Sequence, residues 1–259
     1  DFQWINRNTP EDAHAFLTDV TSAFVVLGVM GPRSRDFLSR LTSTDMSNDA
    51  FPFYTSQEIY IGYAPVRATR ITYVGELGWE LYIPMEFALG VYEAIVDEDD
   101  GFGLRHAGFH AVESLRSEKA YRAWGHDISD QETPLEAGLG FAVDFDKKPE
   151  FIGRDALLRQ RERGLDRRLA VFTLDDPEPL LLGDEPIYRD GVLTGRITSG
   201  SFGHTIGRSV GLGYVETTDG AAAKLIRDGS YEVEIATERF PASASLRPPY
   251  DPKGNRVRA

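Results

Sequence analysis

The chain has 259 residues, of which 41% are hydrophobic and 27% are charged, and this balance is typical of a folded globular protein. Lys and Arg total 28 against 41 Asp and Glu, so a net charge of −13 repels phosphate backbones and anionic lipid, and we expect no nucleic-acid or membrane partner. The chain has no cysteine, which excludes disulfides, thiolate nucleophiles and cysteine-ligated iron–sulfur or zinc sites.

Strand and helix patterns alternate at the start of the chain. Thr9-Pro10-Glu11-Asp12 predicts a helix start, because Thr9 can cap and Pro10 suits the first helical position. A buried strand is predicted over residues 22–29. A second helix is predicted from Gly31-Pro32, because its apolar residues recur at three- and four-residue spacing, at Phe37, Leu38 and Leu41.

Extended segments come next, over residues 58–64, 66–73 and 79–83, and the glycine-flanked connection 74–78 predicts a hairpin. Helices are predicted over residues 85–96 and 108–120, and a short helix over 154–163. Two helices on an antiparallel sheet indicate an α+β layer domain, which we assign to residues 1–164.

From residue 165 onward the pattern changes to short strands. Asp190-Gly191 and Asp228-Gly229 are hairpin-turn dipeptides. A C-terminal β-barrel domain is therefore predicted over residues 165–259. Its strands are predicted at 168–174, 186–189, 192–199, 212–215, 224–226 and 231–236.

Familiar catalytic and nucleotide-binding motifs are missing. There is no G-x-G-x-x-G motif and no phosphate-binding loop. The segment Ser199–Gly203 lacks the first glycine of the G-x-S-x-G motif that holds the nucleophilic serine of hydrolases. His106, His110 and Glu113 would share one helix face, as metal ligands require. Without an H-E-x-x-H pattern, we favour surface or capping histidines over a metal site.

Residues 70–84 carry the first candidate for chemistry. Strand alternation places Trp79, Leu81 and Ile83 on one face, with Glu80 and Tyr82 on the other. Glu80 is then either a solvated edge carboxylate or an acceptor of two hydrogen bonds from the flat N–H edge of a guanidine-like heterocycle. The sequence pattern leaves both interpretations open.

Arg116 is the second candidate. Phe109, Val112 and Arg116 follow helical spacing, which places Arg116 beside an apolar stripe. A buried arginine requires an anion, whereas an arginine at the surface would pair with Glu113 one turn away.

Several segments resemble, in the family's order, the folate-binding aminomethyltransferase family typified by the T-protein of the glycine cleavage system. The matches are Tyr73–Glu80, Ser114–Lys119, Pro134–Gly140, Phe151–Arg154, Thr198–Phe202, Ile206-Gly207 and Gly211–Val215. Segments 119–128 and 249–254 are more similar to the folate-binding halves of dimethylglycine and sarcosine dehydrogenases.

The resemblance implies a ferredoxin-like, T-protein-like α+β layer, the C-terminal barrel and tetrahydrofolate as the bound cofactor. It implies that Glu80 binds the amino and N–H edge of the pterin, while Tyr73 and Arg116 line the same central cavity. Phe141 stands where relatives carry a pocket tyrosine. The full set of folate-binding residues implied by the resemblance is Tyr73, Glu80, Arg116, Trp124, Phe141 and Tyr250.

The implied reaction is capture of a one-carbon unit from an N-methyl or aminomethyl donor to form 5,10-methylenetetrahydrofolate. We expect this chain to be the folate half of a dehydrogenase-like flavoprotein, with FAD on a separate upstream domain. The family's aspartate near folate N10 also lies upstream of the match, so no catalytic residue is assigned, and we expect these 259 residues alone to be inactive.

Other interpretations remain open. One is a stand-alone aminomethyltransferase or folate-dependent demethylase, and another is a non-enzymatic folate-binding module. The chain begins with Asp1 and lacks both a signal peptide and a long apolar stretch. We therefore expect a piece of a longer protein, in the cytoplasm of a bacterium or in the mitochondrial matrix of a eukaryote.

Overall fold

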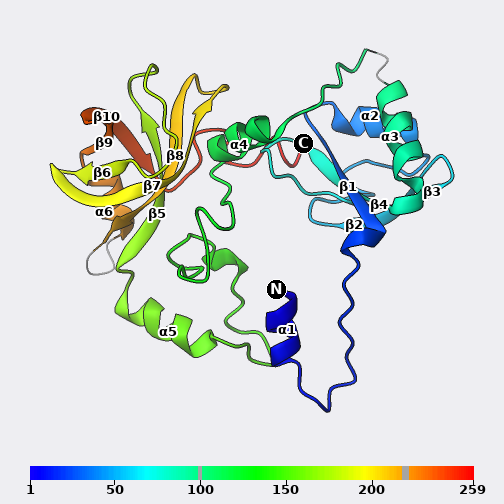
Figure 1. The fold of residues 1–259 in the computed structure, drawn as a ribbon, viewed down its shortest axis with the longest axis horizontal. Coiled ribbons are helices and arrows are strands. Elements are labelled where there is room, and N and C mark those ends of the chain that lie inside the picture. Colours follow the sequence, from blue (N-terminus) through cyan, green and yellow to red (C-terminus); the bar gives the residue numbers. More distant parts are fainter. Residues whose placement is uncertain (99–100, 218–221) are drawn as a thin grey trace. The chain divides into compact units, whose positions relative to one another are not determined.

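A computed structural model describes residues 1–98, 101–217 and 222–259 (Figure 1). The chain forms two compact units. The first comprises Asp1–Thr72, Glu76–Arg105 and Val257–Ala259, and the second comprises Tyr73–Gly75 and His106–Arg256. The boundary predicted at residues 164 and 165 lies inside the second unit, and the division into domains there stays a prediction.

The first unit is built on an antiparallel sheet of order β1-β4-β3-β2. Helices α2 and α3 pack against β4. Its elements are α1 (Phe2–Asn8), η1 (Thr21–Ala23), β1 (Phe24–Met30), α2 (Ser34–Leu41), β2 (Ser56–Ile61), β3 (Ala64–Thr69), β4 (Gly78–Pro84), η2 (Met85–Phe87) and α3 (Ala88–Asp97).

The second unit contains a closed barrel of order β10-β5-β8-β7-β6-β9, which Figure 1 shows with α6 beside it. Helix α4 packs on β7 and β8. The elements are α4 (Phe109–Glu118), η3 (Gly140–Ala142), α5 (Arg154–Arg163), β5 (Arg167–Leu174), β6 (Pro186–Arg189), β7 (Val192–Gly203), β8 (Arg208–Glu216), α6 (Ala222–Asp228), β9 (Tyr231–Ile235) and β10 (Glu238–Ser245).

This architecture confirms the predicted fold class, an α+β layer followed by a C-terminal barrel. The sheet core includes Phe51, Ile59, Val66 and Trp79, all fully buried. The barrel has an interior core of its own, around Phe172. Asp190 and Gly191 both have positive φ, of 53° and 81°, as the predicted hairpin turn between β6 and β7 requires.

The helix predicted from Thr9 is wrong, because Thr9 ends helix α1 instead of starting a new one. Its Oγ1 donates to the carbonyl of Ile5 at 2.8 Å. Its backbone is extended, at φ −84° and ψ 120°, which is the conformation that a following proline favours. The capping residue types are therefore present, but the chain after Pro10 continues without a helix as far as Thr21.

The strand predicted at 224–226 is also wrong, since these residues lie in α6. The segment is rich in Ala, Leu, Lys and Arg, which favour a helix, and its isoleucine, Ile226, is buried in the barrel core. Asp228-Gly229 consequently ends a helix instead of turning a hairpin, with the Gly229 amide donating to the Leu225 carbonyl at 3.1 Å.

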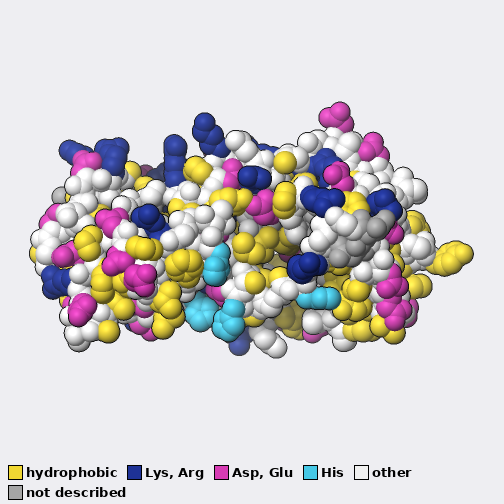
Figure 2. Space-filling view, turned by 90° about the horizontal axis from the view of Figure 1, so that it is seen from above, with side chains coloured by type: hydrophobic (Ala, Val, Ile, Leu, Met, Phe, Trp, Pro, Cys, Tyr) yellow, Lys and Arg dark blue, Asp and Glu magenta, His cyan; other side chains and the backbone are white. Residues whose placement is uncertain are grey.

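The surface is mixed in charge. Figure 2 shows acidic and basic side chains interspersed with hydrophobic ones over the face drawn. Across the described residues, no helix has both the length and the apolar character needed to cross a membrane. The same residues contain no cluster of three His, Asp or Glu side chains that could hold a metal ion.

Candidate functional site

Strand β4 presents Glu80 on the polar face of the sheet. Trp79, Leu81 and Ile83 are fully buried, while Glu80 and Tyr82 are half-buried, as the alternation predicts. In the sheet register Glu80 lies opposite Gly28 on one side and Thr69 on the other. These small neighbours leave the carboxylate accessible.

One oxygen of Glu80 is already bound and the other is free. The Tyr82 hydroxyl donates to Glu80 Oε2 at 2.7 Å. This hydrogen bond, with some burial and the nearby negative charge, raises the pKa of the Tyr82 phenol. Glu80 Oε1 accepts no hydrogen bond from any described residue. The pair therefore resembles the predicted arrangement of a carboxylate with a phenol beside it.

Arg116 is buried on helix α4, with only 1% of its surface exposed. It forms ion pairs with Glu113, one turn earlier, and with Asp127 at 2.9 Å, and it donates to Ser199 Oγ at 2.9 Å. Burial disfavours the cation, but the hydrogen bond to Glu113 and the charges of Asp127 and Glu113 outweigh it, so the pKa of Arg116 is raised. The two alternatives were a buried arginine with an anion and a surface arginine paired with Glu113; Arg116 is buried, and Glu113 is nevertheless one of its two anions.

Asp127 is the anion that the sequence reasoning missed. Its side chain is fully buried and also accepts from the Ala123 amide at 2.9 Å and from the Thr198 hydroxyl. The Tyr214 hydroxyl donates to its backbone carbonyl at 2.9 Å. Thr198 is 71 residues from Asp127, so no local sequence spacing could have indicated the contact between them. The one available signal was that Asp127 is a polar residue within the segment 119–128, which matches the family.

Tyr73 lies in the second unit near the Arg116 cluster. Its hydroxyl donates to the Arg122 carbonyl at 2.9 Å, and its ring stacks on Tyr121 with centroids 6.1 Å apart. Burial raises the pKa of the Tyr73 phenol, and the Arg116 cation opposes that shift. Glu80 belongs to the first unit, so a single cavity shared by Tyr73 and Glu80 stays a prediction.

The three remaining predicted residues have different environments. Trp124 and Phe141 are exposed, by 71% and 84%. Tyr250 is half-buried, with the Lys119 ammonium 5.9 Å from its ring centroid and its amide donating to the Glu118 carbonyl at 3.1 Å. Their role in ligand binding stays a prediction.

Comparison with known proteins identifies the family. The model of the GCVT N-terminal domain matches residues 1–147, and that of the glycine cleavage T-protein C-terminal barrel domain matches residues 167–251. The chain belongs to the glycine cleavage T-protein family. The family resemblance expected from the sequence motifs is thereby confirmed, and the two matches together cover most of the chain.

Two proteins similar to this chain are more than three times as long as it is. The mitochondrial sarcosine dehydrogenase of Mus musculus is 37% identical over 98% of this chain and 28% of its own length. The mitochondrial pyruvate dehydrogenase phosphatase regulatory subunit of Mus musculus is 41% identical over 95% of this chain and 29% of its own. The chain thus spans less than a third of each.

A solved structure supports the fold. The glycine cleavage system aminomethyltransferase T of Bartonella henselae superposes with a TM-score of 0.74, covering 88% of this chain and 60% of that one. Its sequence is 24% identical, so the likeness concerns the fold: the antiparallel sheet and the six-stranded barrel.

Proposed function

We propose that the chain binds tetrahydrofolate and supports transfer of a one-carbon unit to it, forming 5,10-methylenetetrahydrofolate from an N-methyl or aminomethyl donor. The proposal includes its place as the folate-binding part of a longer dehydrogenase-type protein, with any flavin held outside these residues. Membership of the T-protein family and the relation to sarcosine dehydrogenase support this assignment.

The observation that carries the proposal is the free oxygen of Glu80. A pterin presents adjacent N–H groups along one flat edge, and a carboxylate is the side chain that accepts two such hydrogen bonds in parallel. Tyr82 occupies Oε2 from one side and fixes the orientation of the carboxylate, while Oε1 keeps its acceptor capacity. The residues present therefore fit the group.

The contribution of this chain would be binding and orientation. Tetrahydrofolate supplies the nucleophilic nitrogens, so the protein needs no covalent nucleophile of its own. Glu80 would fix the pterin end, which sets the direction of the rest of the molecule. Tyr73, Arg116, Trp124, Phe141 and Tyr250 are proposed as further pocket residues, on the family resemblance.

The test is titration calorimetry with tetrahydrofolate. Glu80→Gln keeps the size of the side chain but turns one acceptor into a donor that faces the donors of the pterin. We expect the free energy of tetrahydrofolate binding to become less favourable by about 1.5–3 kcal/mol, which is the scale of a hydrogen bond to a charged group. Unchanged affinity would remove Glu80 from the site.

A matched control lies on the same face of the sheet. Glu58 is an exposed carboxylate on β2, and the register places Arg67 opposite both Glu58 and Tyr82. Glu58→Gln should leave the affinity unchanged. If the unaltered chain binds no tetrahydrofolate at all, the proposed function itself is wrong.

A second candidate is a folate-binding module without catalysis of its own. The observation that favours it is the 41% identity to a protein named as a regulatory subunit. A longer polypeptide containing this chain distinguishes the two: binding of tetrahydrofolate without formation of methylenetetrahydrofolate from any N-methyl or aminomethyl donor would support the module.

A further inference from the structure

Two arginines of the second unit, Arg122 and Arg168, are half-buried without a carboxylate partner. Arg122 donates to the carbonyls of Ala137 at 3.0 Å and Ala120 at 2.7 Å. Arg168 donates through Nη1 to the carbonyls of Leu135 at 2.7 Å and Glu136 at 3.1 Å. Neither forms an ion pair with any residue that the structure describes. Carbonyl groups are therefore the direct hydrogen-bond partners of both cations, and the Asp127 charge acts on Arg122 without an ion pair.

The two guanidinium groups meet at Gly138. A side chain at this position would lie 2.8 Å from Arg122 Nη2 and 2.8 Å from both Nη1 and Nη2 of Arg168. Gly138 has φ +75°, so the turn itself also requires glycine. Burial lowers the pKa of both arginines, and the neighbouring Arg168 charge lowers that of Arg122 further. The structure thus brings two guanidinium groups together at a turn that has no room for a side chain.

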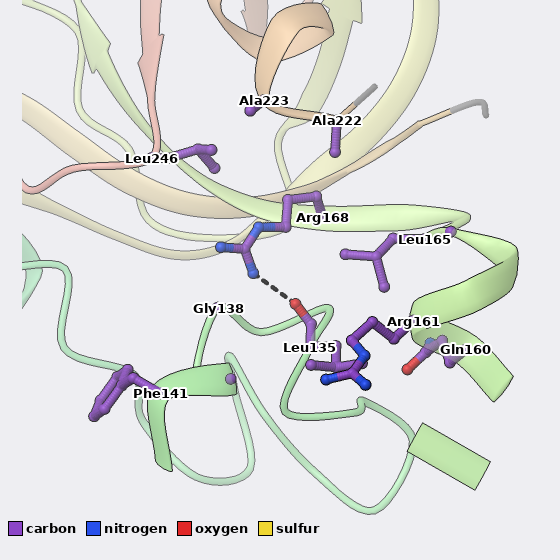
Figure 3. Close-up of a pocket in the computed structure, with 12 residues that line it drawn as sticks. Leu135, Gly138, Phe141, Gln160, Arg161, Leu165, Arg168, Ala222, Ala223 and Leu246 are labelled. Carbon is purple, nitrogen blue, oxygen red and sulfur yellow. Dashed lines mark hydrogen bonds between the residues drawn. The ribbon is translucent and has the colours of Figure 1, made fainter. Parts of the chain in front are cut away.

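A cavity of about 570 Å³ opens beside Arg168 (Figure 3). Its walls are largely apolar, with Leu135, Phe141 and Leu246 among the lining residues, and Arg161 adds a second cation. In the described part of the chain, no Asp or Glu side chain lines this cavity. The charged side chains that the structure describes around the cavity are therefore all positive, although the protein as a whole has a net charge of −13. The local environment therefore favours an anion.

The free donors of Arg168 define the shape of that anion. Nη1 is used by the two carbonyls, while Nε and Nη2 have no hydrogen-bond partner among the described residues. These two N–H groups form the side-on fork that matches the two oxygens of one carboxylate. The apolar walls beside the fork would contact a hydrocarbon body.

We propose that this cavity is a binding site for a small carboxylate with an apolar body, held by the Nε–Nη2 fork of Arg168. Arg122 strengthens the positive potential from behind Gly138, and Leu135, Phe141 and Leu246 contact the apolar part. The site uses residues of the second unit alone and does not include Glu80, although it shares Phe141 with the proposed folate pocket. Benzoate and tetrahydrofolate are titrated separately, and Arg168 belongs to the benzoate site only. Failure of this site and failure of the proposed folate function are therefore separate outcomes.

The test compares simple probes by titration with the whole chain. Benzoate carries both features, acetate the carboxylate alone, benzyl alcohol the apolar body alone, and inorganic phosphate a different anion. We expect benzoate to bind with millimolar affinity and each of the other probes at least several-fold more weakly. Absence of benzoate binding, or tighter binding of phosphate or benzyl alcohol, would overturn the assignment.

Variants locate the binding in the cavity. Arg168→Gln should weaken benzoate binding about tenfold or more, and Arg168→Lys should restore only part of it, because an ammonium keeps the charge but loses the fork. The matched control is Arg167→Gln, on the same strand, whose side chain points to the opposite face and pairs with Glu132 at 3.3 Å. Equal losses in Arg167→Gln and Arg168→Gln would contradict the site.

Two measurements keep the proposal testable if Arg168 variants fail to fold. Phe141 is 84% exposed, so Phe141→Ala should fold, and we expect it to weaken benzoate binding while leaving acetate unaffected. In the unaltered chain labelled with ¹⁵N-arginine, benzoate should shift the Nε–H signal of Arg168 and leave that of Arg167 in place. Unchanged Arg168 resonance at saturating benzoate would exclude the contact.

Discussion

Glu80 and Tyr82 act on each other through a single hydrogen bond on the polar face of β4. The bond stabilises the protonated phenol, because only the O–H form can donate to Glu80 Oε2. The pKa of Tyr82 is therefore raised, first by that hydrogen bond, then by burial and by the charge of Glu80. The hydrogen bond contributes fully to the free energy of unfolding at pH values below the ordinary phenol pKa of about 10. This contribution is lost as the pH rises through the higher pKa that Tyr82 has in the folded state.

The consequence is a test of site geometry that needs no ligand. Glu80→Gln removes the carboxylate charge, so we expect the pKa of Tyr82 to fall toward its ordinary value. The measurement is a pH titration of the ring-carbon signal of Tyr82 by NMR in chain labelled with ¹³C-tyrosine. Glu58→Gln, on the same face of the sheet, should leave the titration unchanged. A Tyr82 curve that does not move in Glu80→Gln would show that the two side chains do not share this bond.

What the sequence could predict at this scale depended on local geometry. Strand alternation placed Glu80 and Tyr82 on one face, and helical spacing placed Arg116 beside an apolar stripe, because both periodicities are local. Asp127 was not predicted as a partner of Arg116, because its own partners are a helix residue 11 positions earlier and a barrel residue 71 positions later in the chain. The proximity of Arg122 and Arg168 was not predicted either. The two residues are far apart in the sequence, and their guanidinium groups meet next to Gly138.

Asp127 ties three elements of the second unit to one another. Its carboxylate contacts Arg116 on α4, the Ala123 amide in the following loop and Thr198 on β7. Helix α4 has a further tether to the same strand, from Ser114 Oγ to the Phe202 carbonyl at 2.6 Å. Because the aspartate is fully buried, its charge is compensated by these contacts and by the nearby Arg122 cation.

Removing that carboxylate should be costly. Asp127→Ala leaves Arg116 buried with Glu113 as its remaining anion, and we expect the free energy of unfolding to fall by about 3–5 kcal/mol, as for other buried pairs that lose one partner. Chemical denaturation measures the change. The control is Asp166→Ala, because Asp166 pairs with Arg163 at 3.2 Å on the surface and should cost at most about 1 kcal/mol. Equal costs would mean that Asp127 does not support the helix.

Errors at the scale of elements have one physical origin. Thr9-Pro10 and Asp228-Gly229 are correct boundary signals, but a boundary signal does not say which side of it is helical. Thr9 closes α1 through its bond to the Ile5 carbonyl, and Gly229 follows the end of α6. By contrast, β5, β6 and β9 were predicted to within one residue of their observed ends, and β7 was predicted from its correct first residue. Strand β8 was predicted only over residues 212–215, and β10 was not predicted.

The whole molecule contains separate hydrophobic cores. The sheet core includes Leu38, Phe51 and Trp79, all in the first unit, and the barrel interior includes Phe172 and Val233 in the second. The buried members of each cluster are at most 8% exposed. Each unit is thus expected to lose its structure through loss of its own core, as independently packed regions do.

Phe172→Ala tests this independence. Phe172 is fully buried and packs edge-to-face on Tyr231, with ring centroids 5.4 Å apart, so truncation should cost about 3–5 kcal/mol. Amide hydrogen exchange should then accelerate in β5–β10, while the amides of β1–β4 keep their protection. Leu38→Ala, in the other core, should produce the reverse pattern at a cost of about 2–5 kcal/mol. If either variant accelerates exchange equally in both sheets, the two units unfold as one cooperative structure, and the separation of the cores does not govern stability.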